Sequence, residues 1–482
     1  MLAVVLGLPV ATGWLAVRAL LGTPSCRPRW AAVLFEASLG AGVGMGLASS
    51  LHFLLLLAGI QSPAAGLGLE AVLLAAAAWL AVHIRAPQGG AGGQRAFRWN
   101  WLLAVVLCVG AALAALAFAT LSDANPTGDW DAWSIWNLRA RMLAAPGDAW
   151  KSAYSPLLEH THPYYPLLVA GFISRCWRFT GEVSDAAPIA VAALFQAAAL
   201  ALLVSAAALL RSACAGLLAG LVLLASSRYL WQGPRQYADV PLSFFELGAV
   251  ALLLWASTLE QRRNTALVLA GACGAFAAWT KNEGLMFFGV LTAALLLMEW
   301  RTLGLRTALA RWCRVALGTA PLLLITLHFK FLLAPGSPPF LSTSAADTLA
   351  RLSDLGRHWQ VLSAFAAEAW RLGDPWTHPI LLLAILAAAL RFERGSRQLP
   401  WAVAAGSAIL VVMAGFYATY VATQLDLRWL LGTSLDRLFA QLWPAFLLVA
   451  FTILRWPEDL MVGQAVPGKT NKHAKKEKRR HG

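Results

Sequence analysis

Long runs of apolar residues, separated by short polar stretches, dominate this chain. Runs such as 102–121, 190–210 and 240–257 hold about 20 residues each, the length that a helix needs to cross the hydrocarbon core of a bilayer. The pattern predicts an all-α polytopic membrane protein with about thirteen spanning helices. We expect these helices to start near residues 2, 31, 66, 100, 184, 212, 239, 265, 284, 314, 378, 400 and 438.

The composition agrees with a membrane protein and excludes a soluble enzyme. Of the 482 residues, 59% are hydrophobic and only 13% are charged, whereas a soluble protein of this length needs far more charge on its surface. The six cysteines are scattered and form no Cys-x-x-Cys pair, which argues against a disulfide framework. The neighbouring histidines His160 and His162 lack a third ligand at a suitable spacing, so the sequence predicts no metal site.

Basic residues indicate how the chain is oriented. The segment 469–480 holds seven Lys or Arg, and such residues collect on the cytoplasmic side of membranes, so we place the C-terminus there and the N-terminus outside. The cytoplasmic side then receives 24 of the 38 Lys and Arg but only six acidic residues. We interpret the basic tail as a topology determinant that contacts anionic lipid, and not as a nucleic-acid-binding segment. Residues 1–21 lack the basic start and cleavage site of a signal peptide, so they are kept as the first span.

Two long polar segments, both on the outer face, interrupt the pattern. They are too polar to span a membrane, but each contains amphipathic stretches with aromatic residues, which predicts helices along the membrane surface. Functional residues are expected in these loops. The predicted organisation is a three-span addition (1–98), a catalytic core (99–333) that includes the first outer segment (122–183), a second outer segment (334–377), C-terminal spans (378–456) and a basic cytoplasmic tail (457–482).

The first outer segment opens with two carboxylates, Asp129 and Asp131, at the mouth of a predicted span. A Pro-Thr-Gly turn precedes them and tryptophans surround them, so a carboxylate here can be partly desolvated and can act as a general base. The alternative is that Trp130, Trp133 and Trp136 form an interfacial belt and the aspartates simply face water.

Two further charged features fall on the same face. Asp239 begins an apolar helix with Pro241 in its first turn, which is also typical of an ordinary helix start. Lys281 and Glu283 lie at the tip of a predicted hairpin, between two apolar runs. Charges embedded between apolar runs are costly and are more often functional than incidental, although a pair that only closes a turn is the alternative.

Several arginines also reach the outer face: Arg139, Arg141, Arg428 and Arg437. An arginine at the mouth of a helix suits a phosphate group, which it can hold with two donors. The alternative is that these side chains anchor lipid head groups. Carboxylates, cations and aromatic walls on one side of a helical bundle suit group transfer from a lipid phosphate.

The order of the motifs resembles the integral-membrane GT-C glycosyltransferases, particularly bacterial relatives of the protein O-mannosyltransferases and of the lipid A aminoarabinose transferases. The resemblance covers about residues 100–330 and includes spacing as well as composition. Beyond it, only the stretch around Ser434–Arg437 and Trp443-Pro444 is similar to the family. The motifs that carry the resemblance are Asp131 followed by Met142-Leu143, Gly147-Asp148, the His162–Leu167 stretch, Arg235 with Asp239, and Thr280-Lys281, where Asn282-Glu283 intervenes before the family's glycine.

This resemblance implies a GT-C-like bundle with amphipathic juxtamembrane helices and a sugar donor carried on a polyprenyl phosphate. It further implies an inverting transfer on the outer face to a lipid, glycan or protein acceptor, with a divalent cation as an optional cofactor. Asp131 becomes the expected general base because of its spacing to Met142, and Asp129 is the second candidate. Lys281, Arg235 and Arg437 are expected to hold the donor phosphate, and Asp239, Glu283, His162, Tyr165 and Trp133 to orient substrate.

Two other classes of protein have comparable sequences. A transporter or flippase of lipid-linked sugars also has many spans and buried charges, but it typically shows internal repeats, which this sequence lacks. A structural membrane subunit would leave Asp131, Asp239 and Lys281 far apart. The Arg- and Ala-rich composition is typical of a GC-rich bacterium, so the bacterial inner membrane is the expected location.

Overall fold

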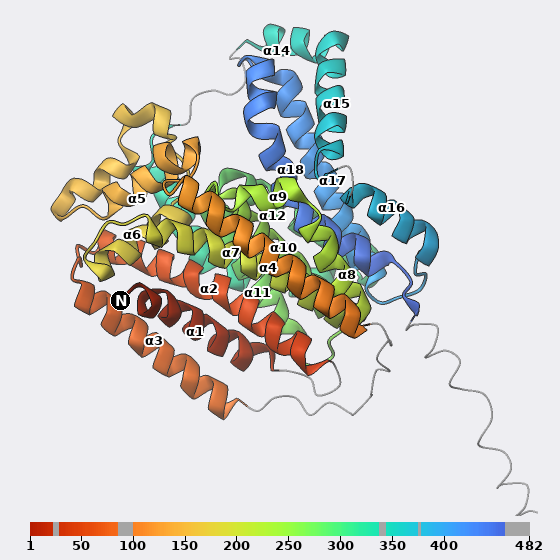
Figure 1. Cartoon of the computed structure of the whole chain (residues 1–482), viewed down its shortest axis with the longest axis horizontal. Helices are drawn as coiled ribbons and strands as arrows, with labels where there is room; N and C mark the ends of the chain where they lie inside the picture. Colours follow the sequence, from red (N-terminus) through yellow and green to blue (C-terminus); the bar gives the residue numbers. More distant parts are fainter. Residues whose placement is uncertain (23–27, 85–99, 337–343, 375–376, 458–482) are drawn as a thin grey trace, which may run out of the picture.

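The computed structural model describes residues 1–22, 28–84, 100–336, 344–374 and 377–457, apart from the side chain of His160. This part of the chain is helical (Figure 1), with one isolated β-bridge and no longer strand among the described residues. The basic tail from residue 458 onward lies outside the described residues. The elements are α1 (Leu2–Leu21), α2 (Arg29–Leu57), α3 (Pro63–His83), α4 (Asn100–Ala124), the π-helix η1 (Ala132–Trp136), α5 (Asn137–Leu143), the 3-10 helices η2 (Gly147–Tyr154) and η3 (Pro156–Thr161), α6 (Leu168–Thr180), α7 (Ala186–Leu210), α8 (Ala213–Leu224), α9 (Ser227–Gln232), α10 (Asp239–Ala256), α11 (Arg263–Thr280), α12 (Asn282–Leu303), α13 (Leu305–His328), the π-helix η4 (Phe329–Leu333), α14 (Ala345–Leu352), α15 (Leu355–Trp370), α16 (Pro379–Leu390), α17 (Leu399–Ala422) and α18 (Leu427–Ile453).

Ten helices in the described ranges are long and apolar enough to cross a membrane, which confirms the all-α polytopic class. The predicted number of thirteen is not confirmed. A helix begins within three residues of eleven of the predicted starts, but α13 and α18 begin at Leu305 and Leu427, well before the predicted residues 314 and 438. Helices α8 and α16 have 12 residues each, and at about 1.5 Å per residue they fall short of a bilayer core of about 30 Å. Helix α11 begins with Arg263 and Asn264, and this polar first turn makes it less apolar than the ten.

Helix α10 forms the centre of the bundle. All 18 of its residues are buried, and it packs against α7, α11 and α18. A helix that is apolar all round is typical of such a central position. Its two charged side chains, Asp239 and Glu246, are consequently enclosed by protein.

Ion pairs at one end of α10 join the loops that the sequence places on a common side. Glu393 lies 3.9 Å from Arg211 and 3.9 Å from Arg455, although these residues belong to three separate loops. This end of the bundle follows the last turn of α10, whereas Asp239 begins the helix at the other end. At about 1.5 Å per residue, the two ends of α10 are about 27 Å apart, close to the thickness of a bilayer core.

The N-terminal helices α1 and α2 cross with their backbones in contact. A Cβ atom on Gly13 would lie 2.0 Å from the carbonyl oxygen of Gly40, and one on Gly44 would lie 1.9 Å from the carbonyl oxygen of Pro9. Small residues allow such close approach, which stabilises helix pairs in lipid by van der Waals contact. Residues 2–21 therefore form a packed helix of the bundle, as expected for a first span.

A buried ion pair fastens this N-terminal addition to the rest of the protein. Arg175 of α6 donates hydrogen bonds to both carboxylate oxygens of Glu70 on α3, and a third to the carbonyl oxygen of Val5 on α1 at 3.0 Å. Its guanidinium also lies 4.7 Å from the ring centroid of Phe179. Neither charged side chain is accessible to a competing partner, because both are buried.

Both outer segments form short helices that pack against the ends of the bundle. In the first, η1, α5, η2, η3 and α6 fold over one end of the bundle (Figure 1), and 11 of the 13 residues of α6 are buried because neighbouring helices cover it. In the second, α14 and α15 rest on the ends of α17 and α18. A separate small apolar cluster that includes Val361 and Tyr420 holds them there.

The Glu70–Arg175 pair leads to a prediction about stability. Glu70→Gln leaves the buried guanidinium of Arg175 without a counter-charge, and breaking a buried pair in this way costs about 3–5 kcal/mol. We expect a clear fall in the unfolding temperature in detergent, followed with a thiol-reactive dye that labels the buried cysteines as they become exposed. Glu182→Gln, at an exposed position, is the control and should leave the transition in place. An unchanged transition for Glu70→Gln would show that the pair does not fasten the addition.

Candidate active site

A glycine turn positions the first acidic motif. Gly128 has a φ of +74°, and a Cβ atom there would lie 2.7 Å from the carbonyl oxygen of Arg235, so a side chain fits neither the backbone conformation nor the space. The amide of Asp129 donates a hydrogen bond to that same carbonyl at 3.2 Å. The turn therefore holds Asp129 and Asp131 against the segment that leads into α10.

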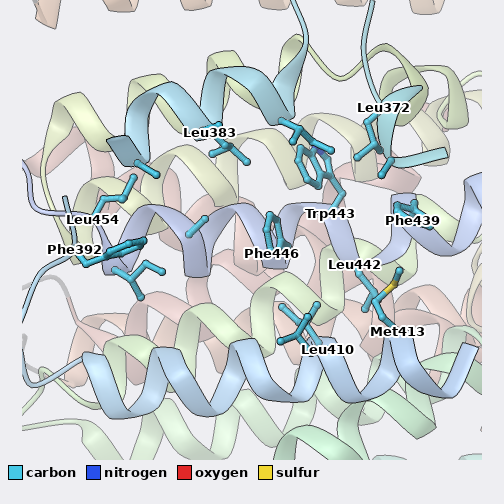
Figure 2. Close-up of a pocket in the computed structure, with 17 residues that line it drawn as sticks. Leu372, Leu383, Phe392, Leu410, Met413, Phe439, Leu442, Trp443, Phe446 and Leu454 are labelled. Carbon is cyan, nitrogen blue, oxygen red and sulfur yellow. The ribbon is translucent and has the colours of Figure 1, made fainter. Parts of the chain in front are cut away.

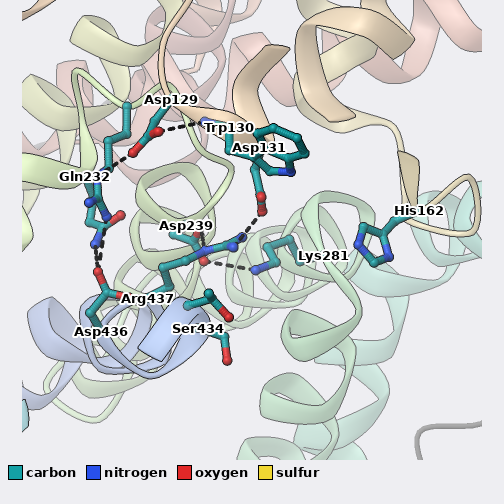
Figure 3. Close-up of polar contacts among 12 residues, drawn as sticks. Asp129, Trp130, Asp131, His162, Gln232, Asp239, Lys281, Ser434, Asp436 and Arg437 are labelled. Atoms are coloured by element: carbon teal, nitrogen blue, oxygen red, sulfur yellow. Dashed lines mark hydrogen bonds and ion pairs between the residues drawn. The ribbon is translucent and has the colours of Figure 1, made fainter. Parts of the chain in front are cut away.

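Arg437 of α18 lies between two carboxylates (Figure 3). Its Nη1 atom is 2.6 Å from Oδ2 of Asp131, and its Nε atom is 3.0 Å from Oδ2 of Asp239. The guanidinium lies over the ring of Tyr237, 4.7 Å from the centroid. The side chains of Asp131 and Arg437 are 17% and 12% exposed, whereas that of Asp239 is fully buried. Of the two carboxylates that contact Arg437, only that of Asp131 is therefore partly exposed.

Asp239 continues the network into the α11–α12 hairpin. Lys281 Nζ lies 2.9 Å from Asp239 Oδ1 and 3.1 Å from Glu283 Oε1, and Gln441 Nε2 donates to Asp239 Oδ1 at 2.5 Å. Asp239 is the first residue of α10, but these contacts show that its side chain does more than start a helix. Likewise, Lys281 does more than close a turn with Glu283. We call Asp131, Arg437, Asp239, Lys281 and Glu283 the Arg437 network.

Asp129 and Arg235 belong to a second, neighbouring network. Arg235 lies 3.2 Å from a carboxylate oxygen of Asp129 and 3.2 Å from one of Asp436, to which Gln232 also donates at 3.1 Å. The structure thus separates the two aspartates of the motif, since only Asp131 contacts Arg437. Among the described contacts, Arg235 reaches neither Asp239 nor Lys281. From the sequence, we expect Arg235 and Lys281 to hold the same phosphate.

Stacked rings form a wall beside the Arg437 network. His162 stacks on Tyr165 with their centroids 5.2 Å apart, and Tyr165 stacks on the buried Trp136 at 5.7 Å. His162 Nδ1 is also 2.6 Å from the hydroxyl of Tyr164. Burial lowers the pKa of His162, and the nearby carboxylate of Asp131 only partly opposes this. Burial likewise raises the pKa of Tyr165 well above its ordinary value, so both rings are neutral at neutral pH.

The tryptophans around the acidic motif do not all exclude water. Trp136 is fully buried, but Trp130 and Trp133 are 64% and 46% exposed and contact each other edge to face at 4.5 Å. That Trp133 orients substrate therefore stays a prediction. Residues three positions apart share a helix face, and here that face points outward.

The remaining arginines of the outer face do not join the site. Arg141 and Arg428 are exposed. Arg139 is fully buried, where it donates to the carbonyl oxygens of Ala153 at 3.0 Å and Pro163 at 3.3 Å. Burial lowers the pKa of Arg139 to about 9. This side chain fixes the loop that carries His162.

Sequence reasoning missed two polar side chains that hold the site together. Gln441 lies one helical turn after Arg437, and a lone amide in an apolar helix is the signal that could have identified it. Lys330 lies in η4, and its Nζ atom donates to Oδ1 of Asn282 at 2.5 Å. Asn282 stands between Lys281 and Glu283, so this bond supports the hairpin at the residues that join the network.

Within the ranges that the structure describes, no group of three His, Cys, Asp or Glu side chains could hold a metal ion. The network instead offers a carboxylate that reaches the surface, beside two cations. Such a carboxylate can accept a proton, and the cations can stabilise an anionic group. No family model, no curated protein and no solved structure matches this chain.

The lowered pKa of His162 predicts how stability depends on pH. The folded protein holds a neutral imidazole, whereas the unfolded chain binds a proton below about pH 6.5. This contribution to stability is therefore present above about pH 6.5 and is lost as the pH falls below it. We expect the unfolding temperature to fall less between about pH 7 and pH 5 in His162→Asn than in the parent chain.

Asparagine suits this test because His162 has a φ of +49°, a left-handed conformation that asparagine tolerates. His358→Asn, at a second histidine outside the site, is the control. Parallel pH profiles for the parent and His162→Asn would show that His162 titrates alike in the folded and unfolded chains.

Proposed function

We propose that this protein is a membrane glycosyltransferase that moves a sugar from a polyprenyl-phosphate donor to an acceptor on the extracytoplasmic face. Its transfer is inverting, with Asp131 as the general base. The observation that carries the proposal is the Arg437 network, in which the residue before η1, α10, the α11–α12 hairpin and α18 contribute charged side chains to one place. A purely structural subunit has no need for this convergence of costly charges.

Each member of the network has a role in the proposed reaction. Asp131 removes the proton from the acceptor hydroxyl, and it is suited to this because it is the carboxylate that reaches the surface beside Arg437. Arg437 and Lys281 stabilise the departing lipid phosphate, with Arg235 in the adjacent network as a further cation. Asp239 orients Lys281 and Arg437 through its two carboxylate oxygens.

An apolar groove supports a donor that is carried on lipid (Figure 2). It has a volume of about 490 Å³, lies between α16, α17 and α18, and is lined only by apolar residues such as Leu383, Met413 and Phe446. A hydrocarbon chain is the natural occupant of such a groove in a membrane-spanning region. Its lining includes Phe439, two residues after Arg437 on α18.

The orientation in the membrane follows from the distribution of basic residues between the two ends of the bundle. The chain is a multi-pass protein by its apolar helices. We assign it to the bacterial inner membrane, with the Arg437 network outside and the basic loops around Arg211, Glu393 and Arg455 in the cytoplasm. With this assignment, the N-terminus is extracytoplasmic and the C-terminus is cytoplasmic.

Asp131→Asn tests the proposed base. The variant keeps the shape of the side chain but cannot accept the proton, and loss of a general base lowers rates by about 10²–10⁴-fold. The measurement uses purified protein in detergent, a panel of radiolabelled polyprenyl-phosphate sugars and envelope extracts as acceptors. Asp148→Asn, which removes an exposed partner of Lys151, is the control and should keep its transfer rate.

Full transfer by a folded Asp131→Asn protein would remove the proposed mechanism. A transporter or flippase is the alternative class of protein. It would move labelled donor across vesicle membranes without forming a glycosylated product.

Lys281→Gln tests the proposed phosphate site. A hydrogen bond to a charged group contributes about 1.5–3 kcal/mol, so we expect the donor concentration for half-maximal transfer to rise about tenfold or more. Lys151→Gln, at an exposed lysine, is the matched control. The same dependence on donor concentration in the parent and in Lys281→Gln would show that Lys281 does not hold the donor.

A further inference from the structure

Of the two carboxylates that contact Arg437, Asp131 is held less tightly than Asp239. Asp239 is buried and has three partners, namely Lys281, Arg437 and Gln441. The Asp131 carboxylate, by contrast, has Arg437 as its one ion-pair partner among the described residues, and it is 17% exposed. An incoming ligand can therefore replace Asp131 on Arg437 without disturbing the buried carboxylate.

The charges of the network favour such a replacement when an anion binds. The network holds three carboxylates and two cations, so its formal charge is negative before any ligand arrives. Both cations already face carboxylates, and Arg437 Nη1 is engaged by Asp131 at 2.6 Å. An anionic group that binds Arg437 on this side meets the carboxylate of Asp131, and like charges at short distance repel each other.

We propose that the Asp131–Arg437 ion pair is a latch that the donor's phosphate opens, an inference that rests on the proposed function. The phosphate replaces the carboxylate on Arg437, and the released carboxylate turns toward the acceptor. Asp131 is a working base only after the donor has bound, so the donor binds before the acceptor reacts. In the resting protein the base is neutralised, which protects the donor site from premature chemistry.

The transfer that follows is balanced in atoms and charge. The acceptor hydroxyl gives its proton to a carboxylate oxygen of the released Asp131. The electron pair of the acceptor oxygen forms the new bond to the anomeric carbon of the sugar. The bond from that carbon to the phosphate oxygen breaks, and its electron pair leaves on the lipid phosphate beside Arg437 and Lys281.

A binding measurement separates the latch from a simple base. The probe is radiolabelled farnesyl phosphate, a short isoprenyl monophosphate, with the full chain in lipid nanodiscs. Asp131 competes with the probe for Arg437. The apparent affinity of the parent chain is therefore its intrinsic affinity multiplied by the fraction of protein whose latch is open. We expect Asp131→Asn to bind the probe about tenfold more tightly than the parent chain.

Asp436→Asn is the matched control, since it removes the same charge one residue away from Arg437 without touching its guanidinium. On a logarithmic scale, Asp436→Asn should change the affinity less than half as much as Asp131→Asn does. Equal effects of the two variants, or no gain with Asp131→Asn, would overturn the latch.

A chemical measurement on the parent chain does not depend on the folding of any variant. Carboxyl groups are labelled with a carbodiimide and glycine ethyl ester, and peptides are quantified by mass spectrometry. Labelling of Asp131 should rise about threefold or more at saturating farnesyl phosphate, while that of the exposed Asp148 stays constant. In Arg437→Gln, Asp131 should be labelled readily with or without the probe.

The two proposals fail in different ways. If farnesyl phosphate binds to the parent chain but leaves Asp131 unlabelled or protects it, the latch is overturned and the proposed function stands. If the probe does not bind at all, the proposed lipid-phosphate donor is contradicted and the latch falls with it.

Discussion

The guanidinium of Arg437, held between Asp131 and Asp239, is the interaction on which the rest of the site depends. Asp239 is fully buried in the central helix, and a buried carboxylate without partners is strongly destabilising. Arg437, Lys281 and Gln441 meet this need, and they come from α18 and from the junction between α11 and α12. The requirement to satisfy one carboxylate therefore fixes how three helices meet at this end of the bundle.

Contacts of this kind matter more in a membrane than in water. Lipid tails are as apolar as the helices, so the hydrophobic effect contributes little to helix association there. Close backbone approach at Gly13, Gly40 and Gly44 and the buried Glu70–Arg175 pair act in its place at the N-terminal addition. The Arg437 network plays the same structural part at the outer end, and the surface-reaching Asp131 is what distinguishes it from a structural ion pair.

The sequence predicted the fold class and the members of the site better than their pairing. Apolar runs identified most of the helix starts, but they placed those of α13 and α18 about ten residues too late. Run length alone did not reveal that α8 and α16 stop after 12 residues. Charge alternation placed Asp131, Asp239 and Lys281 on one face, and the structure brings these residues together. Which helices are neighbours is set by packing over the whole bundle, and a local pattern does not contain this information.

The differences have the same origin. Arg235 pairs with Asp129 and Asp436 because the Gly128 turn lies against its backbone, a contact between segments distant in sequence. Trp133 points outward because it shares a helix face with Trp130. The GT-C glycosyltransferase assignment remains a proposal that is carried by the site geometry and by the motif order.

A double-mutant cycle between Asp131 and Arg437 tests the central interaction most directly. The free energies of unfolding of the parent chain, Asp131→Asn, Arg437→Gln and the double variant are measured by denaturant titration in micelles. Residues in direct ionic contact are expected to show a coupling energy of about 1–3 kcal/mol, and the account predicts a value in this range. Single-variant effects that add within about 0.5 kcal/mol would contradict the ion pair and the site built around it.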